Sequence, residues 1–169
     1  MKKNLVLLGM MGVGKTTVGK IVAKKQGMEF IDTDKNIEKK CLMKISEIFK
    51  NKGEKFFRSE EEKEVLKSLK KNNCIIALGG GAFINRTIRG NVLKNTVSMW
   101  LDIDLKTLNK RMKWNKKRPL LDKEDNQKKV NKLYSERKDI YKLANHKINC
   151  NNLNKKNIAK KIISFYEKY

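Results

Sequence analysis

The chain has 169 residues and carries 41 Lys and Arg against 18 Asp and Glu, which gives a formal net charge of +23. This length fits a single domain, residues 1–169, with a substantial buried core. No apolar run is long enough to cross a membrane, no signal-peptide pattern follows the N-terminal lysines, and three widely spaced cysteines argue against a disulfide framework. We therefore expect a cytoplasmic protein with free thiols.

The positive charge is distributed along the whole sequence rather than gathered in one basic segment. Lysines lie beside many asparagines, and aromatic side chains of the kind that stack on nucleic-acid bases are not interleaved with them. We therefore expect no specific nucleic-acid partner. A positive field suits an anionic small-molecule substrate, because it steers the substrate toward its site.

The first recognisable structure is a phosphate-binding loop. Residues 9–16 read G-x-x-x-x-G-K-T, with the apolar run Leu5–Leu8 before them and a helical pattern after them. In such a strand–loop–helix unit, backbone N–H groups and the helix N-terminus face the same phosphate. The lysine reaches the β- and γ-phosphates, and the threonine hydroxyl holds Mg²⁺. The nucleotide is expected to be ATP, and its expected contacts are Gly12, Val13, Gly14, Lys15, Thr16 and Thr17.

Strands and helices alternate along the rest of the chain. The first helix is expected to end at Gly27, and Asp34 is expected to cap the helix that runs through Cys41. A turn at Asn51–Gly53 is expected to separate a short helix from a long amphipathic one. Further strands are expected at 28–31, 74–78, 97–101 and 147–150, and further helices at 45–49, 54–71, 86–93, 104–112, 127–143 and 158–166.

This alternation predicts an α/β fold, a three-layer αβα P-loop fold with a central parallel sheet of about five strands. The wholly apolar run Cys74–Leu78 is typical of a central strand that is covered on both faces. The basic segment 113–125 contains Pro119, the only proline, and is expected to form a mobile lid.

A phosphate loop alone does not separate GTPases, motor ATPases and kinases. A small GTPase would need the guanine-reading pattern N-K-x-D, and the segment Asn115–Arg118 lacks the final aspartate. A motor ATPase would be longer. A short chain with a lid favours a small-molecule kinase, which has to exclude water in order not to hydrolyse ATP.

Six segments form a recognisable pattern in their order and spacing. They are Gly9–Thr16, Asp32–Asp34, Phe57–Glu61, Leu78–Ala82, Arg118–Leu121 and Tyr134–Arg137. Taken together, they make the chain resemble the shikimate kinase family over essentially its full length. The resemblance implies the nucleoside-monophosphate-kinase type of P-loop fold. It also implies transfer of the γ-phosphoryl group of ATP to the 3-hydroxyl of shikimate, a step toward chorismate and the aromatic amino acids. The lid is more cationic than this chemistry requires, and residues 149–152 match the family loosely.

The resemblance places the acceptor in a helical region at about 33–60 and on the segments that follow. An acceptor carboxylate needs a clamp, and by resemblance Arg58 and Arg137 provide it with their planar guanidinium groups. Glu61, one turn beyond Arg58, is expected to hold that arginine in place. Asp34 follows a strand end, where α/β sheets bind ligands, and is expected to orient or deprotonate the attacking hydroxyl. The backbone that approaches the substrate ring is expected at Gly79, Gly80 and Gly81.

On the nucleotide side, we expect Lys15, Mg²⁺ and Arg118 to neutralise the charge that develops on the transferred phosphoryl group. The expected Mg²⁺ ligands are Thr16 and Asp32, directly or through water. By resemblance, Arg118 lies on the lid and Arg111 stacks on the adenine ring. The residues expected to act in catalysis are thus Lys15, Asp34 and Arg118.

Two alternatives stay open at this point. A kinase for another small hydroxy-acid, such as gluconate, would share the same phosphate loop. A nucleic-acid-binding P-loop module would use the positive charge directly, and its affinity would survive physiological salt. We expect a monomer whose partner is the small-molecule substrate shikimate.

Overall fold

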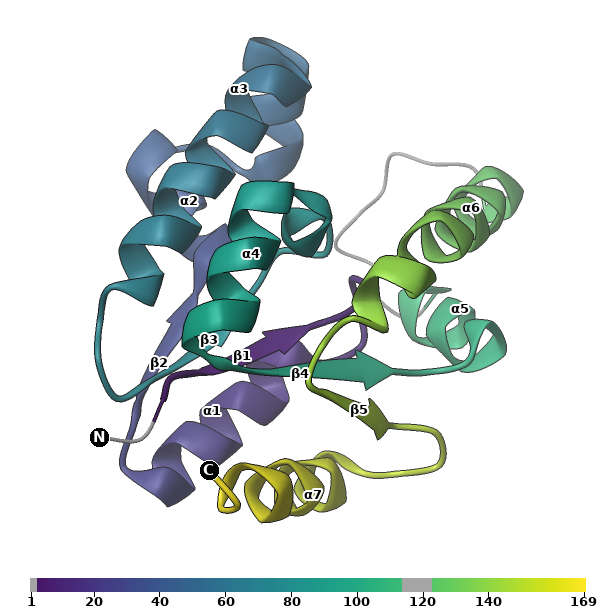
Figure 1. Ribbon diagram of the computed structural model, residues 1–169. Helices are drawn as coiled ribbons and strands as arrows, with labels where there is room; N and C mark the ends of the chain where they lie inside the picture. Colours follow the sequence, from purple (N-terminus) through teal and green to yellow (C-terminus); the bar gives the residue numbers. More distant parts are fainter. Residues whose placement is uncertain (1–2, 114–122) are drawn as a thin grey trace.

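The structure is a computed structural model that describes residues 3–113 and 123–169 (Figure 1). Its centre is a five-stranded parallel sheet with the strand order β2-β3-β1-β4-β5. The strands are β1 (Leu5–Leu8), β2 (Glu29–Asp32), β3 (Cys74–Ala77), β4 (Val97–Asp102) and β5 (His146–Asn149). The predicted strand count and parallel arrangement are confirmed.

Helices cover both faces of this sheet. They are α1 (Lys15–Gln26), α2 (Thr33–Cys41), α3 (Ile45–Leu69), α4 (Arg86–Asn95), α5 (Leu105–Lys113), α6 (Lys123–Tyr141) and α7 (Lys155–Tyr166), with a short 3-10 helix η1 (Ala82–Ile84). Helices α1 and α7 pack together on one face, and α3 and α4 pack together on the other. Every residue of β1 and β3 is buried between these layers, which explains their uninterrupted apolar sequences.

One local prediction was wrong, and it concerns the region that leads to the site. The residue that caps α2 is Asp32, whose Oδ1 accepts a hydrogen bond from the backbone N–H of Lys35 at 3.2 Å. Asp34 lies in the first turn of α2 instead. The break expected at Asn51–Gly53 is present, because Gly53 adopts the non-helical angles φ 81° and ψ 167° and a kink there divides α3 into a short and a long helical segment. Glycine tolerates this conformation because it has no Cβ.

The core has two parts. The main core lies between the sheet and its helices and includes Trp100, which is 2% exposed. A separate small core is formed by Ile37, Ile48 and Phe57, and it joins α2 to α3. The cysteines are free thiols, as expected. Within the described ranges, no helix combines the length and apolar character that a membrane span requires.

Candidate active site

The phosphate loop leaves the end of β1, the central strand of the sheet (Figure 1). Because β3 lies on one side of β1 and β4 on the other, the chain connections diverge at this edge, where open parallel sheets bind ligands. Three glycines of the loop have positive φ angles: 136° at Gly9, 80° at Gly12 and 103° at Gly14. A Cβ at Gly9 would lie only 2.6 Å from the carbonyl oxygen of Leu101, so the loop could not carry a side chain there.

Lys15 is folded along this loop. Its Nζ donates hydrogen bonds to the carbonyl oxygens of Gly9 at 2.8 Å and Met10 at 3.0 Å. Burial lowers the pKa of Lys15 to about 8, and the carboxylates of Asp34 and Asp32 oppose this shift. The loop therefore holds a buried cation close to two acidic groups, ready to exchange main-chain oxygens for phosphate oxygens.

Thr16 and Asp32 meet beside the loop. The Thr16 hydroxyl donates a hydrogen bond to Asp32 Oδ2 at 2.6 Å. Within the described residues there is no cluster of three or more His, Cys, Asp or Glu side chains that could hold a metal on its own. Mg²⁺ in kinases does not need such a cluster, because it takes one or two protein oxygens together with phosphate and water. The hydroxyl–carboxylate pair therefore fits Mg²⁺, as the sequence suggested.

Asp34 and Glu61 bring two carboxylates to one glycine. A Cβ at Gly79 would overlap Oδ1 of Asp34 and would stand 2.8 Å from Oε1 of Glu61. Both oxygens are buried, and within the described part of the chain neither has a hydrogen-bond partner. Buried acceptors without partners are costly and rare in folded proteins. Their position indicates a place where a ligand's hydroxyl groups would donate hydrogen bonds.

The same environment changes the protonation of both acids. Burial raises the pKa of Asp34 to about 6, and the nearby Lys15 ammonium opposes the shift. Burial also raises the pKa of Glu61, against the effect of its ion pair with Arg58. The pKa of the Asp34 carboxyl group thus lies closer to neutral pH than that of an ordinary aspartate. Such a pKa suits a group that receives a proton during a reaction.

Arg58 lies in the long helix α3, one turn before Glu61. Its Nη1 donates to Glu61 Oε2 at 2.7 Å, and its Nε and Nη2 both lie 3.2 Å from Glu54 Oε1. A Cβ at Gly81 would lie 2.6 Å from Arg58 Nη1, so the glycine leaves room for the guanidinium group. The expected pairing of Glu61 with Arg58 is present.

Arg137 reaches the site from α6. A Cβ at Gly80 would lie 3.5 Å from Arg137 Nη1 and 3.3 Å from the backbone nitrogen of Met11, so Gly80 lies between the arginine and the phosphate loop. The guanidinium group is also near Tyr141, one helical turn later, and its charge acts to lower the pKa of the Tyr141 hydroxyl. The sequence reasoning missed Tyr141. The available signal was its spacing, because a residue four positions after Arg137 lies on the same helix face.

The predicted nucleotide contacts beyond the loop are placed in part. Arg111 Nη1 donates to the carbonyl oxygen of Val13 at 3.1 Å, so this side chain lies against the phosphate loop. Arg118 and Trp114 lie outside the described residues, as does most of the predicted lid 113–125. The helix expected from 127 begins earlier, at Lys123.

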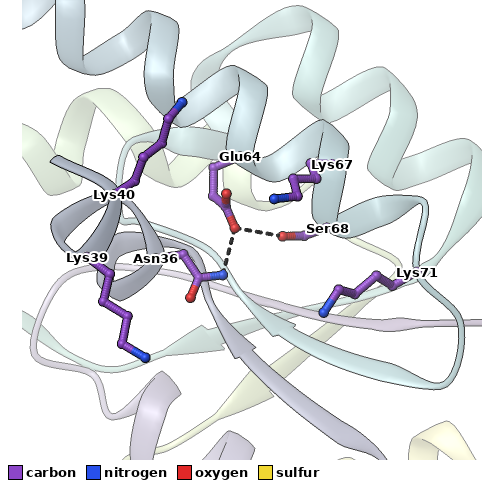
Figure 2. A pocket seen from close by; sticks show the side chains of 7 residues that line it. All are labelled: Asn36, Lys39, Lys40, Glu64, Lys67, Ser68 and Lys71. Atoms are coloured by element: carbon purple, nitrogen blue, oxygen red, sulfur yellow. Dashed lines mark hydrogen bonds between the residues drawn. The ribbon is translucent and has the colours of Figure 1, made fainter.

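Two cavities lie beside this arrangement. One, of about 240 Å³, opens between α2 and α3 (Figure 2), and Glu64 at its centre accepts hydrogen bonds from Asn36 at 2.7 Å and Ser68 at 3.2 Å. It is lined by Asn36, Lys39, Lys40, Glu64, Lys67, Ser68 and Lys71. The other, of about 340 Å³, is lined by Arg58, Ser59, Glu62, Lys63, Leu66 and Asn85. Among the described residues, these two linings share Arg58 alone with the predicted site.

Comparison with known proteins gives a consistent result. The family model described as shikimate kinase matches residues 11–167. A shikimate kinase of Bartonella henselae is 41% identical over 165 residues, covering 98% of this chain and 79% of the relative. A shikimate kinase of Sulfurihydrogenibium sp. is 40% identical over 162 residues, covering 96% of each chain.

Solved structures agree. The chain superposes on a shikimate kinase from Acinetobacter baumannii in complex with shikimate with a TM-score of 0.92 and 31% identity, covering 99% of this chain and 94% of the other. A gluconokinase from Sinorhizobium meliloti reaches a TM-score of 0.62 at 13% identity, covering 98% of this chain and 92% of the other, a likeness of fold alone. The predicted P-loop α/β fold is confirmed, and the chain belongs to the shikimate kinase family of ATP-using kinases.

Proposed function

We propose that this chain transfers the γ-phosphoryl group of ATP to the 3-hydroxyl of shikimate and releases shikimate 3-phosphate and ADP. Family membership supports the reaction class. The observation that carries the proposal in this molecule is the pair of buried oxygens of Asp34 and Glu61 beside Gly79, next to the phosphate loop, which have no hydrogen-bond partner among the described residues. A polyol acceptor satisfies them with its hydroxyl groups.

The acceptor is bound at both of its ends. Shikimate carries one carboxylate, and the guanidinium groups of Arg58 and Arg137 pair with it from α3 and α6. Its hydroxyl groups donate to Asp34 and to Oε1 of Glu61, whose other carboxylate oxygen pairs with Arg58. Gly79 and Gly81 let the ring approach, because a side chain at Gly79 would collide with Asp34 and Glu61, and one at Gly81 would collide with Arg58.

The transfer follows from this placement. The 3-hydroxyl oxygen forms a bond to the γ-phosphorus while the bond from that phosphorus to the β,γ-bridging oxygen breaks, and ADP leaves with that oxygen. Asp34 orients the hydroxyl and accepts its proton. Because phosphoryl transfer proceeds through a loose transition state, proton removal is late and the orientation of the hydroxyl matters most.

The donor side rests on the phosphate loop. Its residues 12–17 bind the phosphates of ATP, and Lys15 neutralises charge on the β- and γ-phosphates. Thr16 and Asp32 would hold Mg²⁺, which supplies further neutralisation of phosphate charge when it is bound. Arg118 contributes a second cation from the lid, and Arg111, which lies against the phosphate loop, stacks on the adenine ring. A monomeric, cytoplasmic enzyme remains our expectation.

The direct test is an ATP-consumption assay with shikimate, with gluconate and without acceptor. Turnover that depends on shikimate and on Mg²⁺ is expected, with little ATP hydrolysis in the absence of acceptor. Turnover with gluconate but not with shikimate would overturn the assignment of the acceptor. Mass spectrometry of the product identifies the phosphorylated hydroxyl-acid directly.

A further inference from the structure

One buried hydroxyl joins the three parts of the site and has no place in the mechanism above. Tyr141 lies at the end of α6, one helical turn after Arg137, and is 0% exposed. Its ring packs against Trp100 with a centroid distance of 5.9 Å. A phenylalanine would fill the same space and make the same ring contact, so the packing alone does not explain the hydroxyl.

The hydroxyl lies at the meeting point of donor loop, acceptor loop and clamp. It donates a short hydrogen bond to the carbonyl oxygen of Gly80, and the Sδ of Met10 lies 3.8 Å away. The Arg137 guanidinium group lies beside the same glycine, since a Cβ at Gly80 would be 3.5 Å from Arg137 Nη1, and its charge acts to lower the pKa of the hydroxyl. Burial raises the pKa of Tyr141, against the opposing effect of Arg137, so the hydroxyl keeps the proton that it donates to Gly80.

These contacts fix the position of two groups at once. Gly80 is already confined between Met11 and Arg137, and its backbone has one more restraint through its carbonyl oxygen. Arg137 is only half-buried and has several rotatable bonds, so its guanidinium group needs a partner to hold one orientation. A buried hydroxyl that is itself held by the Gly80 carbonyl oxygen is a rigid partner of this kind.

We propose that Tyr141 is a positioning residue for the acceptor. Its hydroxyl orients the Arg137 guanidinium group toward the acceptor carboxylate and holds the Gly80 turn against the phosphate loop. The inference rests on the proposed function of Arg137. It predicts that removal of one oxygen atom weakens acceptor binding and leaves ATP binding largely intact.

The test is Tyr141→Phe, with Tyr166→Phe as the matched control. Tyr166 is also 0% exposed, and its hydroxyl donates to the carbonyl oxygen of Lys3 at 2.6 Å, but it lies in α7 on the far side of the sheet. We expect Tyr141→Phe to raise the KM for shikimate about tenfold, because the Gly80 carbonyl loses its donor and the Arg137 guanidinium group loses a polar neighbour, and to change the KM for ATP less than twofold. Both variants should lower the melting temperature by similar amounts, because each loses one buried hydroxyl. Tyr166→Phe should leave both KM values unchanged.

A double-mutant cycle separates positioning from general loosening of the core. If Tyr141 acts through Arg137, Tyr141→Phe has little further effect on shikimate affinity in an Arg137→Lys background. Fully additive losses, or an unchanged shikimate KM in Tyr141→Phe, would overturn the inference. Equal rises in the KM values for ATP and shikimate would do the same. These outcomes differ from failure of the proposed function, in which the unmodified protein itself shows no shikimate-dependent turnover.

Discussion

The ammonium group of Lys15 is the strongest charged partner of the Asp34 carboxylate, and the relation is mutual. Burial raises the pKa of Asp34 to about 6 and lowers that of Lys15 to about 8, and in each case the other residue is the largest opposing influence. The donor loop and the acceptor-binding acid are therefore electrostatically coupled before any ligand arrives. Each group stabilises the charge that the other needs for its part in the transfer.

Replacement of Lys15 should act on both sides of the reaction. Lys15→Ala removes the cation that faces the phosphates and should abolish turnover, while circular dichroism shows a folded protein. It should also raise the pKa of Asp34 further, because the opposing charge is gone. The pH dependence of acceptor binding, measured by calorimetry, reports this shift. Turnover close to that of the unmodified protein would exclude the assigned role.

The raised pKa of Asp34 predicts how the free energy of unfolding changes with pH. Its pKa is raised in the folded protein to about 6, so the folded state binds this proton more tightly than the unfolded chain does. The corresponding stability is present at low pH and is lost as the pH rises through about 6. Asp34→Asn should therefore raise the free energy of unfolding at neutral pH by about 1–2 kcal/mol, less at pH 4, and should abolish turnover.

Urea denaturation at two pH values measures this difference. Asp139→Asn is a useful control, because Asp139 is exposed on α6 and its pKa is lowered by Lys142, the opposite direction. It should gain no stability at neutral pH. In the unmodified enzyme, kcat/KM for shikimate should fall as the pH drops below about 6, because protonated Asp34 no longer accepts the proton. A flat profile across this range would argue against Asp34 as the accepting group.

Arg58 and Arg137 should contribute to the binding of the acceptor but not to the binding of ATP. Arg58→Ala and Arg137→Ala are each expected to raise the KM for shikimate by an amount that corresponds to about 2–5 kcal/mol, because one partner of a charged pair is left alone. The KM for ATP should change little. Arg58→Ala should also destabilise the fold, since Glu61 is 2% exposed and loses its ion-pair partner. An unchanged shikimate dependence would remove that arginine from the clamp.

Gly79 offers a test that changes no charge. Gly79→Ala adds one methyl group that overlaps Asp34 Oδ1 and lies 2.8 Å from Glu61 Oε1, so it displaces both acceptors from their positions. We expect a large loss of kcat/KM for shikimate. Gly90→Ala is the matched control, because Gly90 lies in α4 with no atom within 4 Å of the added Cβ. It should stabilise the protein by about 0.5–1 kcal/mol without effect on activity.

Arg118 provides a prediction for the lid. Arg118→Ala should reduce kcat by about a thousandfold with a much smaller change in substrate KM values, because a transition-state arginine acts mainly on the transferring group. Lys116→Ala and Lys117→Ala remove the same charge from neighbouring positions. If they reduce kcat as strongly as Arg118→Ala does, the lid acts through its net charge alone.

Local sequence signals were sufficient wherever one interaction dominates. The phosphate loop has a fixed spacing, the buried strands are continuous apolar runs, and Gly27 ends α1 in a left-handed conformation as predicted. The position of Arg58 beside Glu61 also followed from helical spacing. These features depend on residues close in the sequence, so a single sequence contains them.

The errors occur where several residues compete for one role. Asp32 and Asp34 are both capping candidates, and only the direction in which the chain leaves β2 assigns the cap to Asp32 and sends Asp34 into the site. The contacts of Tyr141 with Gly80 and Met10 join residues far apart in the sequence. Periodicity predicts that such a residue is buried, but it does not predict which carbonyl its hydroxyl meets.

The small core formed by Ile37, Ile48 and Phe57 has a consequence for the order in which the molecule opens. It is separate from the main core and belongs to the two helices that carry Asp34, Arg58 and Glu61. Amide protons in this subdomain should therefore exchange with deuterium sooner than those of the central sheet, and shikimate should slow that exchange by bridging the subdomain to Arg137. Bound acceptor would then restrain the α2–α3 region against the more rigid part of the protein that carries Arg137, and this restraint would be lost when the product leaves.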